Sequence, residues 1–204
     1  MADQTIAIIG AGGIGSHFCR ILHRLLNAQQ LGATLEPGQF TVYDFDVVEP
    51  KNVKWQDYDM QEIGVPKAML MTLRYGYKAR VKRFVEDDLG HHPRYIIAAD
   101  NAKVRALVFN HVNQVRAGTK HFVDMRSEGD VYAVFTDTCP LKTLMESLGA
   151  DTDSTVGASC QRAGDQERNV VQLGNWFAAV AGMDALLRQF RNTKCPESIV
   201  RTII

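Results

Sequence analysis

Cysteine is scarce in this chain of 204 residues. There are four, and no two of them are close enough in the sequence to form a CxxC pair: Cys19, Cys139, Cys160 and Cys195. This spacing argues against a zinc ribbon built from four cysteines, so we expect no structural zinc. The cysteines also lack the dense pattern of a secreted disulfide framework, which favours a reducing compartment.

The chain also lacks a net charge and a long apolar run. Lysine plus arginine number 23, as do aspartate plus glutamate, so binding of nucleic acid through bulk charge is not indicated. The longest apolar stretch near the carboxyl terminus, Trp176 to Met183, stops at Asp184 and is too short to cross a bilayer. The amino terminus has no signal-peptide pattern. We therefore expect a soluble, cytoplasmic protein without membrane association.

The remaining composition is that of an ordinary globular protein. Hydrophobic residues make up 46% of the chain and charged residues 23%, and the length suits one domain with a sizeable core. No internal repeat or low-complexity segment interrupts it. We treat residues 1–204 as a single domain.

Short β-rich runs alternate with helical patterns, which predicts a parallel or mixed sheet covered on both faces. Ligands bind such sheets beyond the carboxyl ends of the strands, where Asp44 and Asp100 fall. The predicted strands are Thr5–Ile9, Phe40–Tyr43, Arg80–Val85, Tyr95–Ala99, His121–Met125, Val131–Phe135 and an edge strand Ser198–Ile204. The predicted helices are Ile14–Leu26, Ala68–Tyr77, Val104–Val115, Leu141–Leu148 and Asn169–Phe190.

A glycine-rich turn joins the first predicted strand to the first helix. It reads GAGGIG and fits the GxGxxG pattern with Gly10, Gly12 and Gly15, while Gly13 adds a fourth glycine. Glycines allow a tight turn and a close approach of phosphates to the free N–H groups of the helix. The motif alone favours NAD or FAD. The acidic residue expected about 20 residues after such a motif is found further along the chain, at Asp44. A turn that binds nothing is the structural alternative.

Two further motifs bear on which nucleotide the chain binds. The stretch from Asp44 reads DFDVVEPKNVKWQ and is followed by IGVPKA, and a third piece reads ADN with Arg105 four residues later. These pieces, in this order, resemble the family of ThiF, MoeB and the ubiquitin-activating enzymes. That family carries a DxD after the second strand, a V-E pair, N-x-x-R-Q, I-G-x-x-K-A and D-N-x-x-x-R. The resemblance covers residues 4–136 well and the remainder loosely.

The resemblance implies a Rossmann-like three-layer α/β fold whose mostly parallel sheet continues into antiparallel strands. It implies Mg²⁺- and ATP-dependent adenylation of a carboxylate, ordinarily the C-terminal glycine of a ubiquitin-like or sulfur-carrier protein, giving acyl-AMP and pyrophosphate. Because the family's site is completed across a subunit interface, it also implies a homo- or heterodimer.

Individual residues acquire roles through this resemblance. Asp44 would accept hydrogen bonds from the ribose, Lys67 would place positive charge on the phosphates, and Asp100 would bind Mg²⁺. Each has an ordinary alternative: a strand end for Asp44, a solvated lysine for Lys67, and a helix N-cap for the Asp100-Asn101 pair. The other residues assigned to the nucleotide are Gly10, Gly12, Gly13, Gly15, Asp46, Asn52, Gln56 and Asn101.

The sequence departs from the family at one position. Trp55 stands where N-x-x-R-Q has an arginine, and an indole cannot replace a forked cation on a phosphate. Lys54, Arg105 or an arginine from a partner are candidates for that charge. Alternatively, the chain is a nucleotide-binding or partner-binding scaffold that has lost turnover. An NAD-dependent oxidoreductase is the third reading, and it rests on the glycine turn alone.

Many members of the family use a cysteine that attacks the acyl-adenylate. Cys139 and Cys160 lie in the region where such a residue is expected. Cys160 is the candidate we select, because it lies in a polar stretch with Arg162 nearby to lower a thiol pKa. An ordinary free or buried cysteine is the alternative for both.

Overall fold

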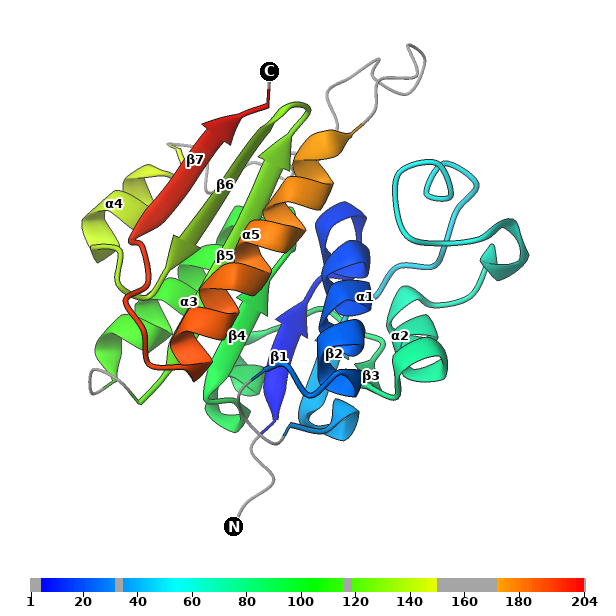
Figure 1. The fold of residues 1–204 in the computed structure, drawn as a ribbon, viewed down its shortest axis with the longest axis horizontal. Helices are drawn as coiled ribbons and strands as arrows, with labels where there is room; N and C mark the ends of the chain where they lie inside the picture. Colours follow the sequence, from blue (N-terminus) through cyan, green and yellow to red (C-terminus); the bar gives the residue numbers. More distant parts are fainter. Residues whose placement is uncertain (1–4, 32–34, 116–118, 150–171, 204) are drawn as a thin grey trace.

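The computed structural model describes residues 5–31, 35–115, 119–149 and 172–203. Within these ranges, strands of one sheet lie in the order β3-β2-β1-β4-β5-β6-β7 (Figure 1). Neighbouring strands from β3 to β5 pair in parallel, and β6 and β7 continue the sheet antiparallel. The strands are β1 (Ile6–Ile9), β2 (Phe40–Tyr43), β3 (Lys78–Arg80), β4 (Arg94–Ile97), β5 (His121–Glu128), β6 (Val131–Thr136) and β7 (Ser198–Thr202).

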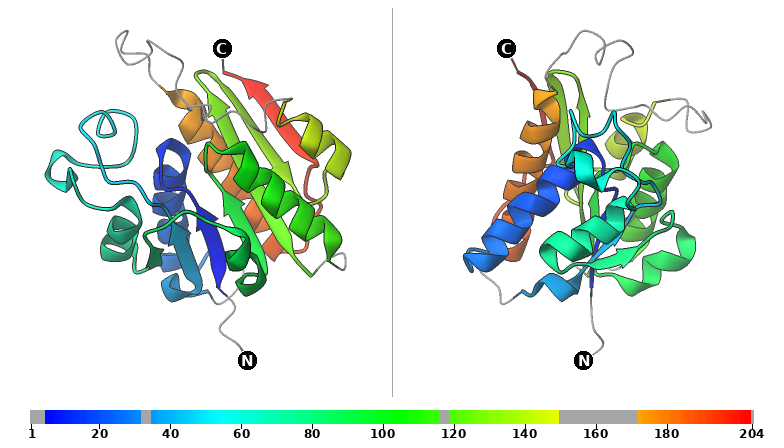
Figure 2. Two further views of the ribbon diagram at one scale, coloured as in Figure 1. Left: turned by 180° about the vertical axis from the view of Figure 1, so that it is seen from behind. Right: turned by 90° about the vertical axis from the view of Figure 1, so that its right-hand side faces the viewer.

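Helices cover both faces of the sheet (Figures 1 and 2). One face carries α1 (Gly13–Asn27), α2 (Lys67–Tyr75) and α5 (Leu173–Phe190), and the other carries α3 (Ala102–Gln114) and α4 (Leu141–Glu146). Short 3₁₀ turns lie at Pro37–Gln39, Met60–Glu62 and Glu86–His91. The predicted three-layer α/β fold with a mostly parallel sheet is therefore confirmed. No helix in the described ranges is long and apolar enough to cross a membrane.

The unbroken apolar run of β1 follows from the central position of this strand, which is covered on both faces. All four residues of β1 are buried. Alternate side chains point to opposite faces, so Ile6 and Ile8 pack in the core under α1, while Ala7 and Ile9 pack in the core under α3. The helical spacing of Ile14, Phe18 and Leu22 likewise buries one side of α1 against the sheet.

The predicted third strand, Arg80–Val85, was placed too late. The helix before it ends at Gly76, which adopts φ +75° and donates its N–H to Thr72 O. The chain enters the sheet directly afterwards, and Ala79 pairs with Val42 of β2. Lys78 and Arg80 are exposed on this edge strand.

Candidate nucleotide-binding site

The glycine turn lies where the carboxyl ends of β1, β2 and β4 meet. Gly10 N–H donates to Tyr43 O at the end of β2 (2.9 Å), and Gly10 adopts φ +95°. A Cβ on Gly10 would lie 2.9 Å from the Ala98 carbonyl, and one on Gly15 would lie 2.0 Å from Gly10 O. These two positions therefore require glycine. A Cβ on Gly12 would meet nothing within 4 Å, so the turn borders open space there.

Asp44 connects the end of β2 to this turn. Its Oδ2 accepts the Ala11 N–H (2.7 Å), and its Oδ1 accepts the Asp46 N–H (2.8 Å). The side chain is buried, and this burial raises the pKa of Asp44 despite the two N–H donors and the nearby charge of Lys67, which lower it. The carboxylate is thus held in one orientation, with further lone pairs on both oxygens.

Two residues that sequence reasoning missed, Tyr58 and Ser16, join the long connection after β2 to the glycine turn and the start of α1. Tyr58 is buried and its hydroxyl donates to Ala11 O (2.5 Å), so Ala11 is bonded through both its N–H and its carbonyl. Ser16 Oγ on α1 accepts the Asp57 N–H (3.0 Å). Neither residue belongs to a periodic pattern, and only contact between segments distant in the sequence reveals them.

The same connection carries Lys67 to the first turn of α2. Val47 forms an antiparallel bridge with Pro66, and Lys67 N–H donates to Asp46 O (2.9 Å). The Lys67 side chain is buried, and its Nζ lies 3.5 Å from Asp46 Oδ2. The I-G-x-x-K-A lysine therefore lies beside the DxD carboxylate, and the alternative of a solvated lysine is wrong.

The N-x-x-W-Q segment forms an ordered turn. Asn52 is buried; its Oδ1 accepts the Glu49 N–H (2.8 Å), and its carbonyl accepts the N–H groups of Trp55 and Gln56. Asn52 thus holds this turn through its side chain and its carbonyl. Trp55 Nε1 and Gln56 Oε1 are buried without a hydrogen-bond partner. No cation occupies the motif's arginine position.

The third motif follows β4 and is built more loosely. Asp100 is exposed. Asn101 is the N-cap of α3, since its side-chain oxygen accepts the N–H of Lys103 (2.8 Å) and of Val104 (3.4 Å). Arg105 points into the protein, where its Nε donates to the fully buried Asp124 (3.0 Å). Arg105 is therefore committed to an internal ion pair and does not supply the missing phosphate cation.

Of the described cysteines, Cys19 and Cys139 are buried and Cys195 is half-buried. Cys139 is buried, and burial raises the pKa of its thiol, so it is not an activated nucleophile. Cys160, the selected candidate, lies outside the described residues. Among the described residues, no three metal-ligating side chains cluster.

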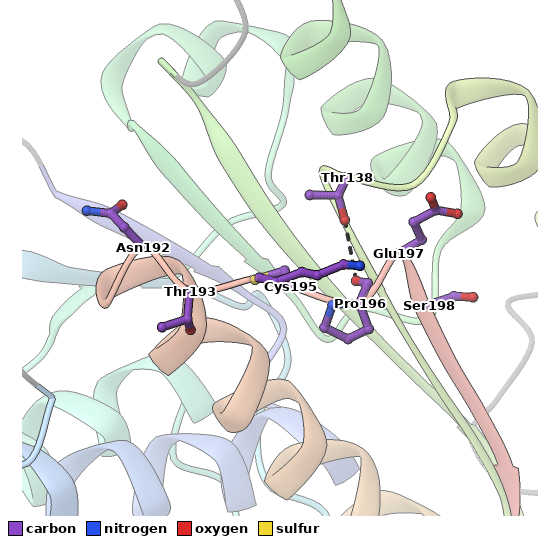
Figure 3. A pocket seen from close by; sticks show the side chains of 8 residues that line it. Thr138, Asn192, Thr193, Cys195, Pro196, Glu197 and Ser198 are labelled. Atoms are coloured by element: carbon purple, nitrogen blue, oxygen red, sulfur yellow. Dashed lines mark hydrogen bonds between the residues drawn. The ribbon is translucent and has the colours of Figure 1, made fainter.

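A surface groove also exists after α5, away from the glycine turn (Figure 3). It is lined by Thr138 and by the link Asn192–Ser198, and Thr138 Oγ1 donates to Pro196 O (3.4 Å). None of the motif residues contributes to it. The chemistry suggested by the motifs is therefore gathered at the opposite end of α5.

Solved structures with this fold are numerous. E. coli MccB with ATP has 15% identity and a TM-score of 0.63, over 99% of this chain and 61% of that one. PaaA has 12% identity and a TM-score of 0.63, over 99% and 62%. The E. coli tRNA N6-threonylcarbamoyladenosine dehydratase TcdA has 17% identity and a TM-score of 0.62, over 94% and 87%.

These likenesses establish the fold, and this chain spans about three fifths (61%) of the length of MccB. No curated protein sequence matches the chain. The ThiF family matches residues 1–186, a range that includes the glycine turn and all the motifs described above. This chain belongs to the ThiF family.

Proposed function

We propose that this chain binds Mg-ATP at the glycine turn and transfers its adenylyl group to a carboxylate. The arrangement of Asp44 is the observation that carries the proposal. Its two oxygens are fixed by the N–H groups of Ala11 and Asp46 and keep lone pairs for ribose hydroxyls. In this arrangement the open side of the turn at Gly12 receives the phosphates, next to the N-terminus of α1.

The reaction balances as a displacement at the α-phosphorus. An acceptor carboxylate oxygen forms the new bond, the bond to the bridging oxygen breaks, and pyrophosphate leaves with the electron pair. The protein's part is mainly positioning and stabilisation of charge. Lys67 supplies a buried cation, and Asp46 orients its ammonium group. Asn52 and Gln56 keep the loop over the phosphates ordered.

Magnesium fits the donors near Asp100. An exposed carboxylate beside the N-cap of α3 is a hard oxygen ligand of the kind that Mg²⁺ shares with phosphate oxygens. The ion would neutralise charge on the departing pyrophosphate. Asn101 supports this position by capping α3, rather than by binding the nucleotide through its side-chain oxygen.

The acceptor in this proposal is the C-terminal carboxylate of a ubiquitin-like or sulfur-carrier protein. Membership of the ThiF family supports it. The similar MccB structures include complexes with ATP and with MccA, which supports a peptide or protein acceptor. Whether Cys160 then takes over the acyl group is a separate part of the proposal, tested by Cys160→Ser.

A dimer is also part of the proposal. Four large apolar side chains are exposed along one face of α5 at helical spacing: Leu173, Trp176, Phe177 and Val180. Such a face is typical of an interaction surface. Light scattering on the purified chain should give a dimer mass, which Val180→Glu should reduce to a monomer. Leu73→Glu, at a still more exposed apolar site on α2, is the control and should leave the mass unchanged.

Two measurements test the proposed activity. Thermal unfolding should shift upward with Mg-ATP and not with NAD, because a ligand at about 100 times its Kd stabilises by about 2.7 kcal/mol. Incubation with Mg-ATP and a peptide ending in Gly-Gly should then give peptide-AMP by mass spectrometry. The same peptide with a C-terminal amide is the control and should stay unmodified.

Trp55 favours one alternative, a family member that binds the nucleotide without turnover. An unfolding shift with Mg-ATP but no peptide-AMP from any free C-terminal carboxylate would support that reading. A shift with NAD alone would contradict the adenylation proposal.

A further inference from the structure

Asn175 is a polar residue in the buried face of α5, where glycine and alanine predominate. It lies in the first turn of the helix and is 1% exposed. Its Oδ1 accepts a hydrogen bond from Ser127 Oγ on β5. In this arrangement Nδ2 points away from the Ser127 hydroxyl.

Asn175 Nδ2 is buried and has no hydrogen-bond partner. A buried donor left unpaired costs about 1–3 kcal/mol, and each such group in a folded protein calls for an explanation. A leucine or alanine at this position of α5 would avoid the cost. The amide therefore suits a ligand that brings its own acceptor.

The amide faces the glycine turn. A Cβ on Gly13 would lie only 2.6 Å from Asn175 Nδ2, so the fourth glycine of the motif makes room for this side chain. Gly13 is the first residue of α1, where N–H groups have no acceptor within the helix and the dipole favours an anion. At Gly12 the turn is open. The unpaired side-chain donor and the helix N-terminus thus adjoin each other beside that opening.

We infer that Asn175 is a phosphate-binding residue of the nucleotide site, with Nδ2 donating to a phosphoryl oxygen held at the N-terminus of α1. The inference rests on the proposed function and extends its site to α5, which none of the sequence motifs includes. Ser127 is the positioning residue, because its hydroxyl holds Oδ1 and leaves Nδ2 for the ligand. The donor adds to Lys67 at a site whose motif arginine is replaced by Trp55.

Isothermal titration of Mg-ATP into the full chain and three variants tests this inference. Asn175→Ala removes the donor and should raise the Kd about tenfold, the loss expected for one hydrogen bond to a charged group. Asn175→Asp keeps the shape and the Ser127 bond but places a negative charge beside the phosphate, so its Kd should rise further.

Gln189→Ala is the matched control on the same helix. Gln189 is also a buried amide, but its Nε2 donates to Phe122 O (2.9 Å) and Asp137 Oδ1 (2.7 Å), and its Oε1 accepts from Arg94. This variant should lose thermal stability and keep the parent's Kd for Mg-ATP, which separates weakened folding from weakened binding.

The outcomes are distinct. A Kd within about twofold of the parent's for both Asn175 variants, well below the tenfold expected, would show that the amide is structural only and would overturn the inference while leaving the proposed function intact. A parent chain that fails to bind Mg-ATP would contradict the proposed function and this inference together.

Discussion

The carboxyl ends of β2 and β4 each present an acidic residue from a family motif, and the two surroundings differ. Asp44, after β2, is buried and accepts two backbone N–H groups. Asp100, after β4, is exposed, and its neighbour Asn101 is used as the N-cap of α3. One end of the site is thus organised by the chain's own bonds, whereas the other presents a solvated carboxylate.

In the proposed function, this difference assigns nucleotide binding to the Asp44 side of the site and the transfer reaction to the Asp100 side. In the proposed site, the fixed acceptors of Asp44 and the buried cation of Lys67 would be in place before the nucleotide arrives, which would reduce the ordering required on binding. In the same proposal, the Asp100 side would be completed by a metal ion and phosphate oxygens. Substitutions on the two sides should therefore affect different steps.

The largest effect on ATP affinity is expected from Asp44→Asn. The substitution removes the charge that is proposed to accept the ribose hydroxyls. The new amide NH₂ also faces a backbone N–H at one of the two existing hydrogen bonds. The Kd for ATP should rise about hundredfold, since hydrogen bonds to charged groups contribute about 1.5–3 kcal/mol each. Isothermal titration measures this. Asp184→Asn, which changes an exposed carboxylate on α5, is the control. An equal loss of ATP affinity in this variant would contradict a specific role for Asp44.

Lys67→Met should have an intermediate effect. Methionine retains the apolar stem without the charge, so the fold should persist while the Kd for ATP rises about tenfold. Formation of peptide-AMP should fall more than binding does, because charge on the phosphates increases as the bond breaks. Lys51→Met, a loop lysine with an exposed ion pair to Glu49, should change neither quantity.

Asp100→Asn should leave metal-free ATP binding unchanged within about twofold, because the residue is exposed and accepts no bond that shapes the turn. Peptide-AMP formation in Mg²⁺ should fall about 10²–10³-fold, the usual loss when one charge-stabilising group is removed. Rates at saturating Mg-ATP give this comparison. Unchanged turnover would show that magnesium is held elsewhere.

The smallest effect concerns pH. Burial raises the pKa of Asp44, so between its ordinary and its raised pKa the folded chain holds a proton that the unfolded chain has released. The contribution of Asp44 to stability therefore falls as pH rises through that interval. Denaturant titrations of the ligand-free chain should show this slope, and Asp44→Asn should flatten it. If Asp44→Asn kept the parent's slope of stability against pH, the attribution of this pH dependence to Asp44 would be wrong.

The elements that carry the site were predictable because their signals are local. The apolar run before Gly10 predicted β1, and the run that stops after Tyr43 predicted β2 with Asp44 directly after it. β3 was misplaced because its position depends on where Gly76 ends α2 and on pairing with β2. Short strands with exposed lysine and arginine carry little periodic signal.

The residues that complete the site were not predictable in the same way. Tyr58 reaches Ala11 from 47 positions away, and Asn175 reaches Gly13 from another helix. Asn175 did leave one signal, an amide inside an apolar helical stripe. Only the fold shows that this amide faces the glycine turn.

One titration tests the central claim most directly, namely that the β2 side is organised for nucleotide binding without the β4 side. ATP is titrated in EDTA into the parent, Asp44→Asn and Asp100→Asn. The account predicts that the parent and Asp100→Asn bind with the same Kd and that Asp44→Asn binds far more weakly. Equal binding by Asp44→Asn, or loss of binding in Asp100→Asn without magnesium, would contradict it.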